Sequence, residues 1–499
     1  MELVGYSFKS CKFMKKRVAN HKEEVIKLLK KQKIRTLKDL EDYKLSICHP
    51  YSAGIDIGSR EIYVAINPEV AAELDMPIVR VFSTFTSGLQ ECRDWLKYCG
   101  IDSVSMESTS VYWKNIYDIL ENAGIEPCLV NPRKFRMVPG RKTDVLDCQW
   151  LQTLHMYGLL SGSFVPQGNI RQLRSYMRHR DCVLKERGKY IQRMQKNLIE
   201  MNLMLVNVVD DIMGMTGAKI ITAILDGERN PNVLAAFRHG GCKRSEQEIA
   251  EALNGNYKEE QLYLLKANYE AYKFFNDQIT DLDNQIEVLL DKFPLAQKKE
   301  PGTDTSNESG SMENYSPVKK KKQSKSKNDL RIKNLPDKLT EIIGIDLTTV
   351  TGLQANTILQ IISEVGTDMS KFPSAKNFAS YLGFVPHNKI TGGVIISSST
   401  DRVKSPAAHA FRKVVASVGQ GKTALGAFYR RIAAKGSKAK AIIALCRKLA
   451  MIYYNTIVYG KEFVEYGAEK YKKQQELREK RLIAKLAKKH KLTVQAAVC

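Results

Sequence analysis

The sequence predicts an α/β domain joined to a mainly helical remainder. Residues 51–165 alternate short apolar runs with longer amphipathic segments, which is typical of strands and helices around a mixed sheet. Residues 166–296 instead carry apolar residues at helical spacing. Residues 335–460 form a further, mainly helical region. The predicted fold class is therefore α/β plus all-α.

Within residues 51–165, each element follows from its local pattern. Gly58 separates the first two strands as a tight turn, and Asn131-Pro132 ends the last strand. The predicted order is a strand–turn–strand at Ala53–Ile66, strands at Val79–Thr84 and Asp102–Met106, a helix at Val111–Ala123, a strand at Glu126–Val130 and a helix at Lys142–Leu160.

Residues 166–296 contain two apolar seams with the 3,4 spacing of coiled-coil helices. A Gly- and Pro-punctuated segment, Gly214–Asn256, lies between the seams and predicts a small helical insertion. The seams favour an antiparallel hairpin within one chain, which needs no partner, over a coiled coil between chains, although both can hold in an oligomer. The first seam is Ile191, Met194, Leu198, Met201, Leu205, Val208 and Ile212, and the second runs from Leu265 to Phe293.

Three further segments are charged and flank these regions. Residues 1–50 are predicted to be a basic N-terminal extension, and residues 461–499 a basic helical tail. Residues 297–334 combine Ser, Gly, Asn and Asp with a lysine run, so they are predicted to be a disordered linker. We favour a solvated tether for this linker, and a phosphate-binding arm is a compatible second role.

The net charge points to nucleic acid as the partner. The 499 residues include 78 Lys+Arg and 54 Asp+Glu, which gives a formal charge of +24. The ten cysteines lack zinc-site spacing, which favours reduced thiols in a cytoplasmic protein, associated with the nucleoid when acting. No signal peptide is expected. Ala439–Val458 is interrupted by Arg447 and Lys448, so we expect a buried amphipathic helix and no membrane association.

Four acidic residues of the α/β domain are the candidate catalytic and metal-binding residues. Asp56 lies in a Gly-Ile-Asp-Ile-Gly strand, and Glu107 ends another strand. Asp144 and Asp147 are three apart on one helix and share a face. Four such carboxylates can converge on Mg²⁺, with Mn²⁺ as the alternative, beside a phosphodiester. Each short motif alone is weak evidence for a metal site. A helical DxxD usually lies on a solvated face, and sugar kinases and actin-like ATPases have a similar first strand.

Longer phrases around these acids carry a family resemblance. The order Gly54–Gly58, Glu107–Trp113, Val130–Pro132 and Arg141–Asp147 resembles the DEDD transposases of the insertion-sequence-110 class. That class includes bridge-RNA-guided recombinases and Piv-type DNA invertases. The resemblance implies an RNase H/RuvC-like first domain with the four acids as metal ligands. Ser110 departs from the family, which usually has Gly there.

The second domain carries the candidate nucleophile. Glu341–Gly366 looks like a helix-hairpin-helix unit with Gly352 in its turn, although an ordinary helical corner is an equal alternative. The phrase Tyr381–Gly393 resembles the family's transposase domain, in which a serine before the glycine attacks DNA. Thr391 occupies that position here. A threonine hydroxyl can be an activated nucleophile, although its methyl group crowds in-line attack. Ser397, Ser398 and Ser399 are the fallback nucleophiles.

Basic residues outside the acidic site are the candidate nucleic-acid contacts, because arginine favours bidentate phosphate contacts. Ordinary surface charge is the alternative for them. The resemblance implies that a guide RNA does the sequence reading, and the protein then recognises RNA shape and backbone. The predicted contacts are Lys142, Arg171, Arg174, Arg178, Arg180, Lys319, Lys320, Lys321, Lys322 and Lys389.

Together these observations predict a transposase or site-specific DNA recombinase of a mobile element. Its expected partners are double-stranded DNA, a structured non-coding RNA and further copies of the chain in a dimer or tetramer. A metal-dependent, structure-selective nuclease would use water and leave Thr391 idle. A domesticated nucleic-acid-binding protein would lack catalysis. An actin-like phosphotransferase, suggested only by the Gly54–Gly58 strand, would hydrolyse ATP.

Overall fold

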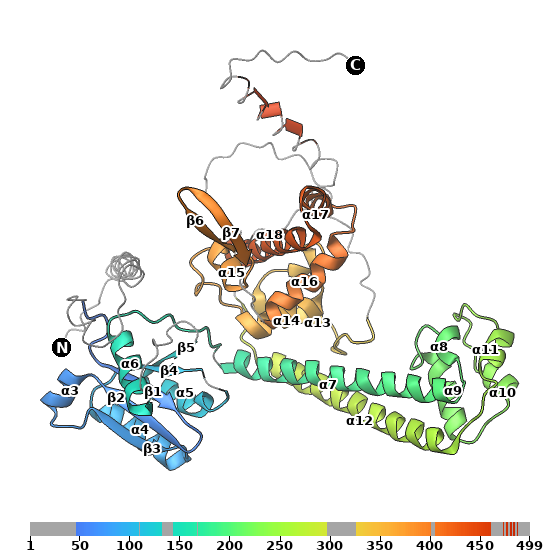
Figure 1. The fold of residues 1–499 in the computed structure, drawn as a ribbon, viewed down its shortest axis with the longest axis horizontal. Coiled ribbons are helices and arrows are strands. Elements are labelled where there is room, and N and C mark those ends of the chain that lie inside the picture. The colour runs from blue at the N-terminus through green and yellow to red at the C-terminus, as the bar shows by residue number, and fades with distance from the viewer. Residues whose placement is uncertain are drawn as a thin grey trace. The chain divides into compact units, whose positions relative to one another are not determined.

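The computed structural model comprises two compact units, Met1–Val165 and Pro166–Cys499, each of which is described by itself (Figure 1). The structure describes residues 46–108, 110–131, 143–166, 168–296, 326–400, 405–460 and a few positions between 473 and 487. The proposed N-terminal extension up to residue 45 and most of the basic tail lie outside these residues.

The first unit is built on one five-stranded mixed sheet with the order β3-β2-β1-β4-β5. The first three strands are antiparallel, and β1, β4 and β5 run parallel. The strands are β1 (Ser52–Ile57), β2 (Glu61–Ile66), β3 (Val79–Ser83), β4 (Ser103–Glu107) and β5 (Glu126–Val130). All five predicted strands are present, so the α/β prediction for this region is confirmed.

Helices cover both faces of this sheet. They are α3 (Pro68–Glu73), α4 (Thr86–Tyr98), α5 (Trp113–Asn122) and α6 (Asp144–Met156). Ile55 and Met106 face the core formed with α4 and α5, whereas the alternate positions of β1 and β4 face α6. Helices α3 and α4 are additional to the predicted elements, and Leu89, Cys92 and Leu96 give α4 a buried face. The sheet order and its two helical layers are those of an RNase H/RuvC-like domain.

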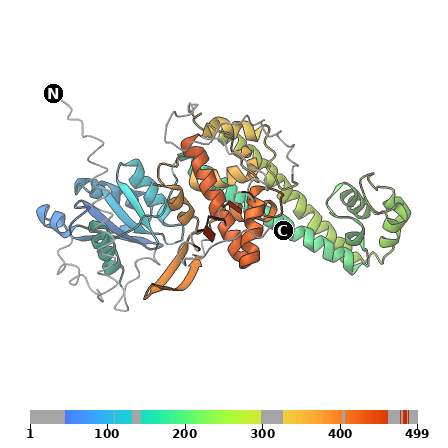
Figure 2. The same cartoon turned by 90° about the horizontal axis from the view of Figure 1, so that it is seen from above.

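The second unit contains a long antiparallel helical hairpin, α7 (Gly168–Glu200) and α12 (Glu259–Leu290), whose helices lie side by side in both views (Figures 1 and 2). The predicted hairpin is therefore present within one chain. The prediction that the first seam continues to Ile212 is wrong: α7 ends at Glu200, and Asn202 takes a left-handed conformation (φ 56°).

Short helices fill the far end of the hairpin, as the insertion prediction requires. They are α8 (Leu205–Val208), α9 (Met215–Leu225), α10 (Pro231–Ala235) and α11 (Glu246–Ala252). Ser245 begins α11 with a reciprocal capping box to Glu248. A separate apolar core, which includes Leu198, Ile220 and Ile249, holds these helices together. The later residues of the first seam pack in this core, which also includes Leu265 and Tyr272 of α12.

The remaining helices are α13 (Leu335–Ile343), η2 (Leu347–Thr349), α14 (Ala355–Val365), α15 (Ala375–Tyr381), α16 (Pro406–Val418), α17 (Ala424–Lys435) and α18 (Lys438–Tyr459). Gly352 lies between α13 and α14 at φ 88°, and a Cβ there would lie 2.2 Å from the Val418 side chain of α16. The helix–turn–helix prediction is correct in outline, with its first helix beginning earlier than expected.

Helix α18 is the central helix of this core. By length and composition it alone, among the described residues, could cross a membrane. One face, which includes Leu445, Leu449 and Tyr453, is instead fully buried against neighbouring helices. The Tyr454 hydroxyl donates to the Phe372 carbonyl oxygen at 2.7 Å. The expectation of a buried amphipathic helix is confirmed.

Two helical regions that the sequence analysis separated share one core. Leu173 of α7 and Ile286 of α12 are buried in the same cluster as the α14 and α18 side chains. Leu330 and Ile332, near the end of the predicted linker, are also buried there. Residues 326–334 are therefore packed, because two apolar side chains anchor them, and the predicted linker is too long at this end.

Candidate functional site

Two of the predicted acids lie at the same edge of the first unit's sheet. Strands β1 and β4 pair in parallel, with Ile55 opposite Met106. Asp56 and Glu107 are the next residue on each strand, so both lie where the strands approach their carboxyl ends. Both side chains are partly buried. Parallel pairing thus brings together two acids that are far apart in the chain.

Helix α6 packs closely on this sheet because β1 carries Gly54. A Cβ at Gly54 would lie 2.3 Å from the Cys148 carbonyl oxygen and from the Gln152 nitrogen, so any larger residue would push the helix away. The Ser105 hydroxyl donates to the Leu151 carbonyl oxygen at 3.1 Å, which joins β4 to α6. The Gln152 amide donates to the Ser52 hydroxyl at 3.4 Å and joins α6 to β1. These contacts fix the helix that carries the other two acids.

Asp144 and Asp147 occupy the first turn of α6. Thr143 caps this helix, and its hydroxyl accepts from the Leu146 nitrogen at 3.3 Å. Carboxylates at this position interact favourably with the helix dipole. The close approach of α6 to β1 therefore directs Asp144 and Asp147 toward Asp56.

The four acids act on one another electrostatically. The pKa of Asp56 is raised from 3.8 to about 6, first by burial and then by the negative charges of Asp144, Asp147 and Glu107. Tyr63, which pairs with Asp56 across β1 and β2, also has a raised pKa, due to desolvation, Glu61, Asp144 and, to a smaller extent, Asp56. The structure thus brings together all four predicted acids in one concentration of negative charge.

This donor set fits a hard divalent cation. Carboxylate oxygens are the ligands that Mg²⁺ and Mn²⁺ prefer, and a cation would relieve the repulsion that adds to burial in raising the Asp56 pKa. Within the described ranges, however, no three His, Cys, Asp or Glu side chains are already arranged around one coordination point. Their side chains would have to rotate to share a cation.

The candidate nucleophile lies in the second unit, on a β-hairpin that the sequence analysis did not predict. Strands β6 (Pro386–Thr391) and β7 (Val394–Thr400) pair through a two-residue turn at Gly392 and Gly393, which have φ 57° and 78°. Two glycines with positive φ between β-branched residues are a hairpin signal that the sequence carried. Thr391 is exposed and pairs with Val394 at the tip.

The fallback serines lie on the other strand of the same hairpin. Ser397, Ser398 and Ser399 are opposite Lys389, Asn388 and His387 respectively. Ser397 is partly buried, whereas Ser398 and Ser399 are exposed. The hairpin therefore carries all four predicted hydroxyl nucleophiles, with Thr391 nearest its turn.

The arginines of α7 have internal partners. Arg180 is buried, and its guanidinium Nε donates to an Asp283 carboxylate oxygen at 2.5 Å. Arg178 donates to both carboxylate oxygens of Glu364, at 2.8 and 2.9 Å. Arg174 donates to the Ser363 and Glu364 carbonyl oxygens, and Arg171 to that of Pro166. For Arg180, burial overturns the expected surface role: its charge is used inside the protein.

The other predicted nucleic-acid contacts divide into two groups. Lys389 is exposed on β6 of the hairpin and stays a candidate. Lys142 and Lys319–Lys322 lie outside the described residues. The sequence did not reveal that Gly54, although part of the first motif, and Ser105 hold α6 in place. A lone glycine or serine in an apolar strand was the available signal.

The fold and the acidic edge define the class of the first unit as an RNase H/RuvC-like α/β domain. Two family models match the chain: a DEDD-type model of the IS110 class, described as Transposase, at residues 53–202, and Transposase IS116/IS110/IS902 family at residues 346–415. No curated protein matches. The two matched regions contain all four acids and Thr391, in the order that the resemblance implied. The two matches together support an insertion-sequence-110-class transposase.

Proposed function

We propose that this transposase cleaves and exchanges DNA strands through a transient covalent link between Thr391 and DNA, with Asp56, Glu107, Asp144 and Asp147 holding Mg²⁺. The observation that carries the proposal is the close packing of α6 on β1 and β4, which brings the two acids of the helix to the two acids at the sheet edge. Burial and the charges of the other three acids accordingly raise the pKa of Asp56. A bound divalent cation would supply Lewis-acid activation of the phosphodiester. The acids would orient the cation, and α6 would hold two of them in position.

The proposed strand cleavage is a direct displacement at phosphorus. The Thr391 hydroxyl oxygen forms a new bond to phosphorus, and the bond from phosphorus to one bridging DNA oxygen breaks. That oxygen leaves with a proton equivalent to the one that Thr391 loses. Attack by a DNA hydroxyl on the Thr391 phosphodiester then reverses the step, joins a new strand and restores the free threonine.

Covalent trapping tests the role of Thr391. Wild-type protein is expected to form a denaturant-resistant complex with suicide DNA from the element ends, and Thr391→Ala is expected to form none. Thr391→Ser should retain the complex, because serine keeps the hydroxyl and lacks the crowding methyl group. Ser398→Ala on the same hairpin is the matched control. Recovery of the DNA-linked peptide from another residue would overturn this role.

A second candidate function is DNA hydrolysis by a metal-dependent nuclease. The threonine at the family's serine position favours it, because the added methyl group hinders attack by Thr391. A nuclease would cleave the same DNA with Thr391→Ala and would leave no protein attached. The Thr391→Ala variant therefore separates the two candidates in one assay.

Guide RNA and oligomerisation complete the proposal. The family membership and the charge of +24 support a structured RNA partner, double-stranded DNA and a dimer or tetramer acting in the cytoplasm. Purification from cells followed by RNA sequencing is expected to recover one discrete RNA encoded beside the gene. Recovery of only bulk cellular RNA would contradict guidance by RNA and would favour an unguided invertase or nuclease.

A further inference from the structure

A small cavity lies at the edge of the first unit's sheet that carries the acids, on the face covered by α4 and α5. It has a volume of about 190 Å³ and opens between the β1–β2 turn, the start of α4 and the start of α5. Its lining residue Ile57 directly follows Asp56, and Val111 and Tyr112 follow the Glu107 strand. A polynucleotide strand that crosses this edge with one phosphate at the acids would therefore bring a neighbouring nucleotide to this cavity. The other lining residues are Ser59, Ile62, Thr84, Leu89, Asn115 and Ile116.

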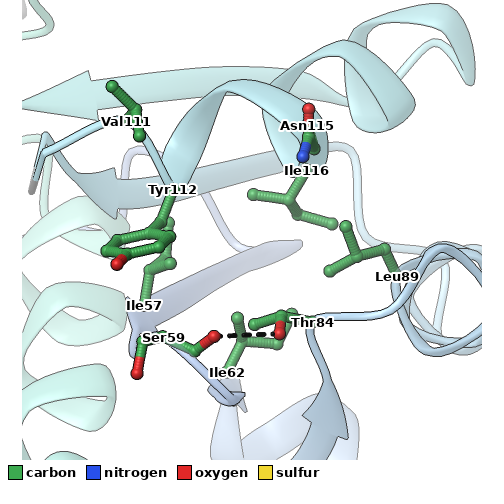
Figure 3. A pocket seen from close by; sticks show the side chains of 9 residues that line it. All are labelled: Ile57, Ser59, Ile62, Thr84, Leu89, Val111, Tyr112, Asn115 and Ile116. Carbon is green, nitrogen blue, oxygen red and sulfur yellow. Dashed lines mark hydrogen bonds between the residues drawn. The ribbon is translucent and has the colours of Figure 1, made fainter.

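The lining suits a neutral planar ring. Ile57, Ile62 and Ile116 are buried and form an apolar floor. Figure 3 shows the Tyr112 ring beside Ile57 and Ser59, with Leu89 on the other side of the space. An apolar floor with an aromatic wall favours a flat ring that can stack.

Polar groups at the rim can read the edge of such a ring. The Thr84 hydroxyl donates to the Ser59 carbonyl oxygen at 3.1 Å, which leaves the Thr84 oxygen able to accept a hydrogen bond. The Asn115 side chain is exposed and offers both donors and an acceptor. None of the nine lining residues carries a charge, so the cavity itself does not favour phosphate.

The surroundings of the cavity contain unusually exposed apolar side chains. Tyr112 is 46% exposed, Val111 is 59% exposed, and Phe85, which follows the lining residue Thr84, is 77% exposed. Large apolar groups exposed together mark a binding surface. The volume is below the ~300–1,000 Å³ of sites for drug-sized ligands, which matches one ring and not a whole cofactor.

We propose that this cavity accepts one unstacked nucleobase of the DNA strand that crosses the four acids. The proposal rests on the proposed DNA chemistry for its choice of strand. Holding one base out of the stack would fix the position of the neighbouring phosphodiester at Asp56 and Glu107, at the cost of unstacking that base. Tyr112 would stack on the base, and Asn115 and Thr84 would contact its edge.

Methyl NMR on the full chain tests binding of the base directly. The probe is deoxyadenosine 5′-monophosphate in EDTA, and deoxyribose 5-phosphate is the control without a base. The methyl signals of Ile57, Ile62 and Ile116 are expected to shift with the nucleotide only. Equal shifts with the sugar phosphate, or none with the nucleotide, would overturn the proposal.

Oligonucleotide affinity tests the stacking residue. In EDTA, Tyr112→Ala is expected to weaken binding of a short single-stranded DNA about fivefold, the equivalent of about 1 kcal/mol. The matched control Tyr98→Ala removes an exposed tyrosine of α4 outside the cavity and should change nothing. An abasic oligonucleotide should bind wild type and Tyr112→Ala equally. Equal affinities of all three proteins for normal DNA would contradict base binding.

These measurements are independent of catalysis, because they exclude metal and measure no cleavage. If Asp144→Asn abolishes cleavage and the methyl signals do not respond, the base pocket fails and the proposed function stands. If the methyl signals respond and Asp144→Asn still cleaves, the proposed function fails and the binding site stands. Each proposal can thus be contradicted separately.

Discussion

The acids of the first unit and the arginines of α7 are both clusters of like charge along the sequence, yet they differ in how their charges are balanced. Burial, and then the negative charges of three neighbouring acids, raise the pKa of Asp56 to about 6. On α7, Arg180 is paired with Asp283, and Arg178 with Glu364. The acids repel one another, whereas each of these arginines has an opposite charge within contact.

This difference separates charge that is available to a ligand from charge that stabilises the fold. A cluster of repelling carboxylates costs folding free energy, which a bound cation would recover. A buried arginine–carboxylate pair gains no stability from a ligand, and loss of either partner leaves a buried charge without its counter-charge. We therefore expect substitutions at the two clusters to affect different measurements.

The largest expected effect is on activity at the acidic cluster. Asp144→Asn should lower DNA cleavage by about a hundredfold or more, because it removes one ligand of the cation that would stabilise the transition state. Asp144 is exposed, so the thermal unfolding midpoint should fall little or not at all. Cleavage of DNA from the element ends measures the first effect and calorimetry the second. Asp102→Asn, at an acid outside the cluster, is the control. Full activity of Asp144→Asn would show that the acidic cluster does not serve cleavage.

The next effect is on stability at the arginine cluster. Arg180→Ala should lower the free energy of unfolding by about 3–5 kcal/mol, because Asp283 would be left buried and unpaired. Chemical denaturation of the full chain measures it. The double variant Arg180→Met/Asp283→Leu should recover much of the loss, since no buried charge remains. Undiminished stability of Arg180→Ala would show that the pair is not structural.

A smaller effect links the acidic cluster to metal. Asp56→Asn should stabilise the metal-free protein by about 1 kcal/mol, a value that allows for the partial exposure of this carboxylate. Mg²⁺ should raise the unfolding temperature of wild type and do so much less for Asp56→Asn. Differential scanning fluorimetry with and without EDTA measures both. If Mg²⁺ raises the unfolding temperature of both proteins equally, the metal does not bind at Asp56.

The smallest effect is expected in the salt dependence of DNA binding. Lys389→Gln should reduce the slope of log K against log [salt] by about one, because an exposed lysine would release one counterion. Arg178→Gln should leave the slope unchanged, since Glu364 already holds that guanidinium. A lower slope for Arg178→Gln, with no change for Lys389→Gln, would instead indicate that Arg178 contacts nucleic acid.

Local pattern predicted most of the first unit and little of the packing around it. The predicted bounds of the strand at Glu126–Val130 are correct to the residue, because a short apolar run between turn residues usually forms a buried strand. Helix α4 was omitted, although its buried face follows helical spacing. The β6–β7 hairpin was missed because its Gly392-Gly393 turn was read as part of a mainly helical region.

The sequence by itself determined the α/β and helical regions, the four acids and the family, because periodicity and motif order are local properties of the chain. Only the tertiary structure decided which charges have partners. Arg180 lies 103 positions from Asp283, and Arg178 lies 186 positions from Glu364. Pairing across such separations depends on how α7, α12 and α14 pack together, and no local pattern encodes it. In the first unit, the close approach of α6 to Gly54 likewise brings four acids that are scattered along the sequence near one another.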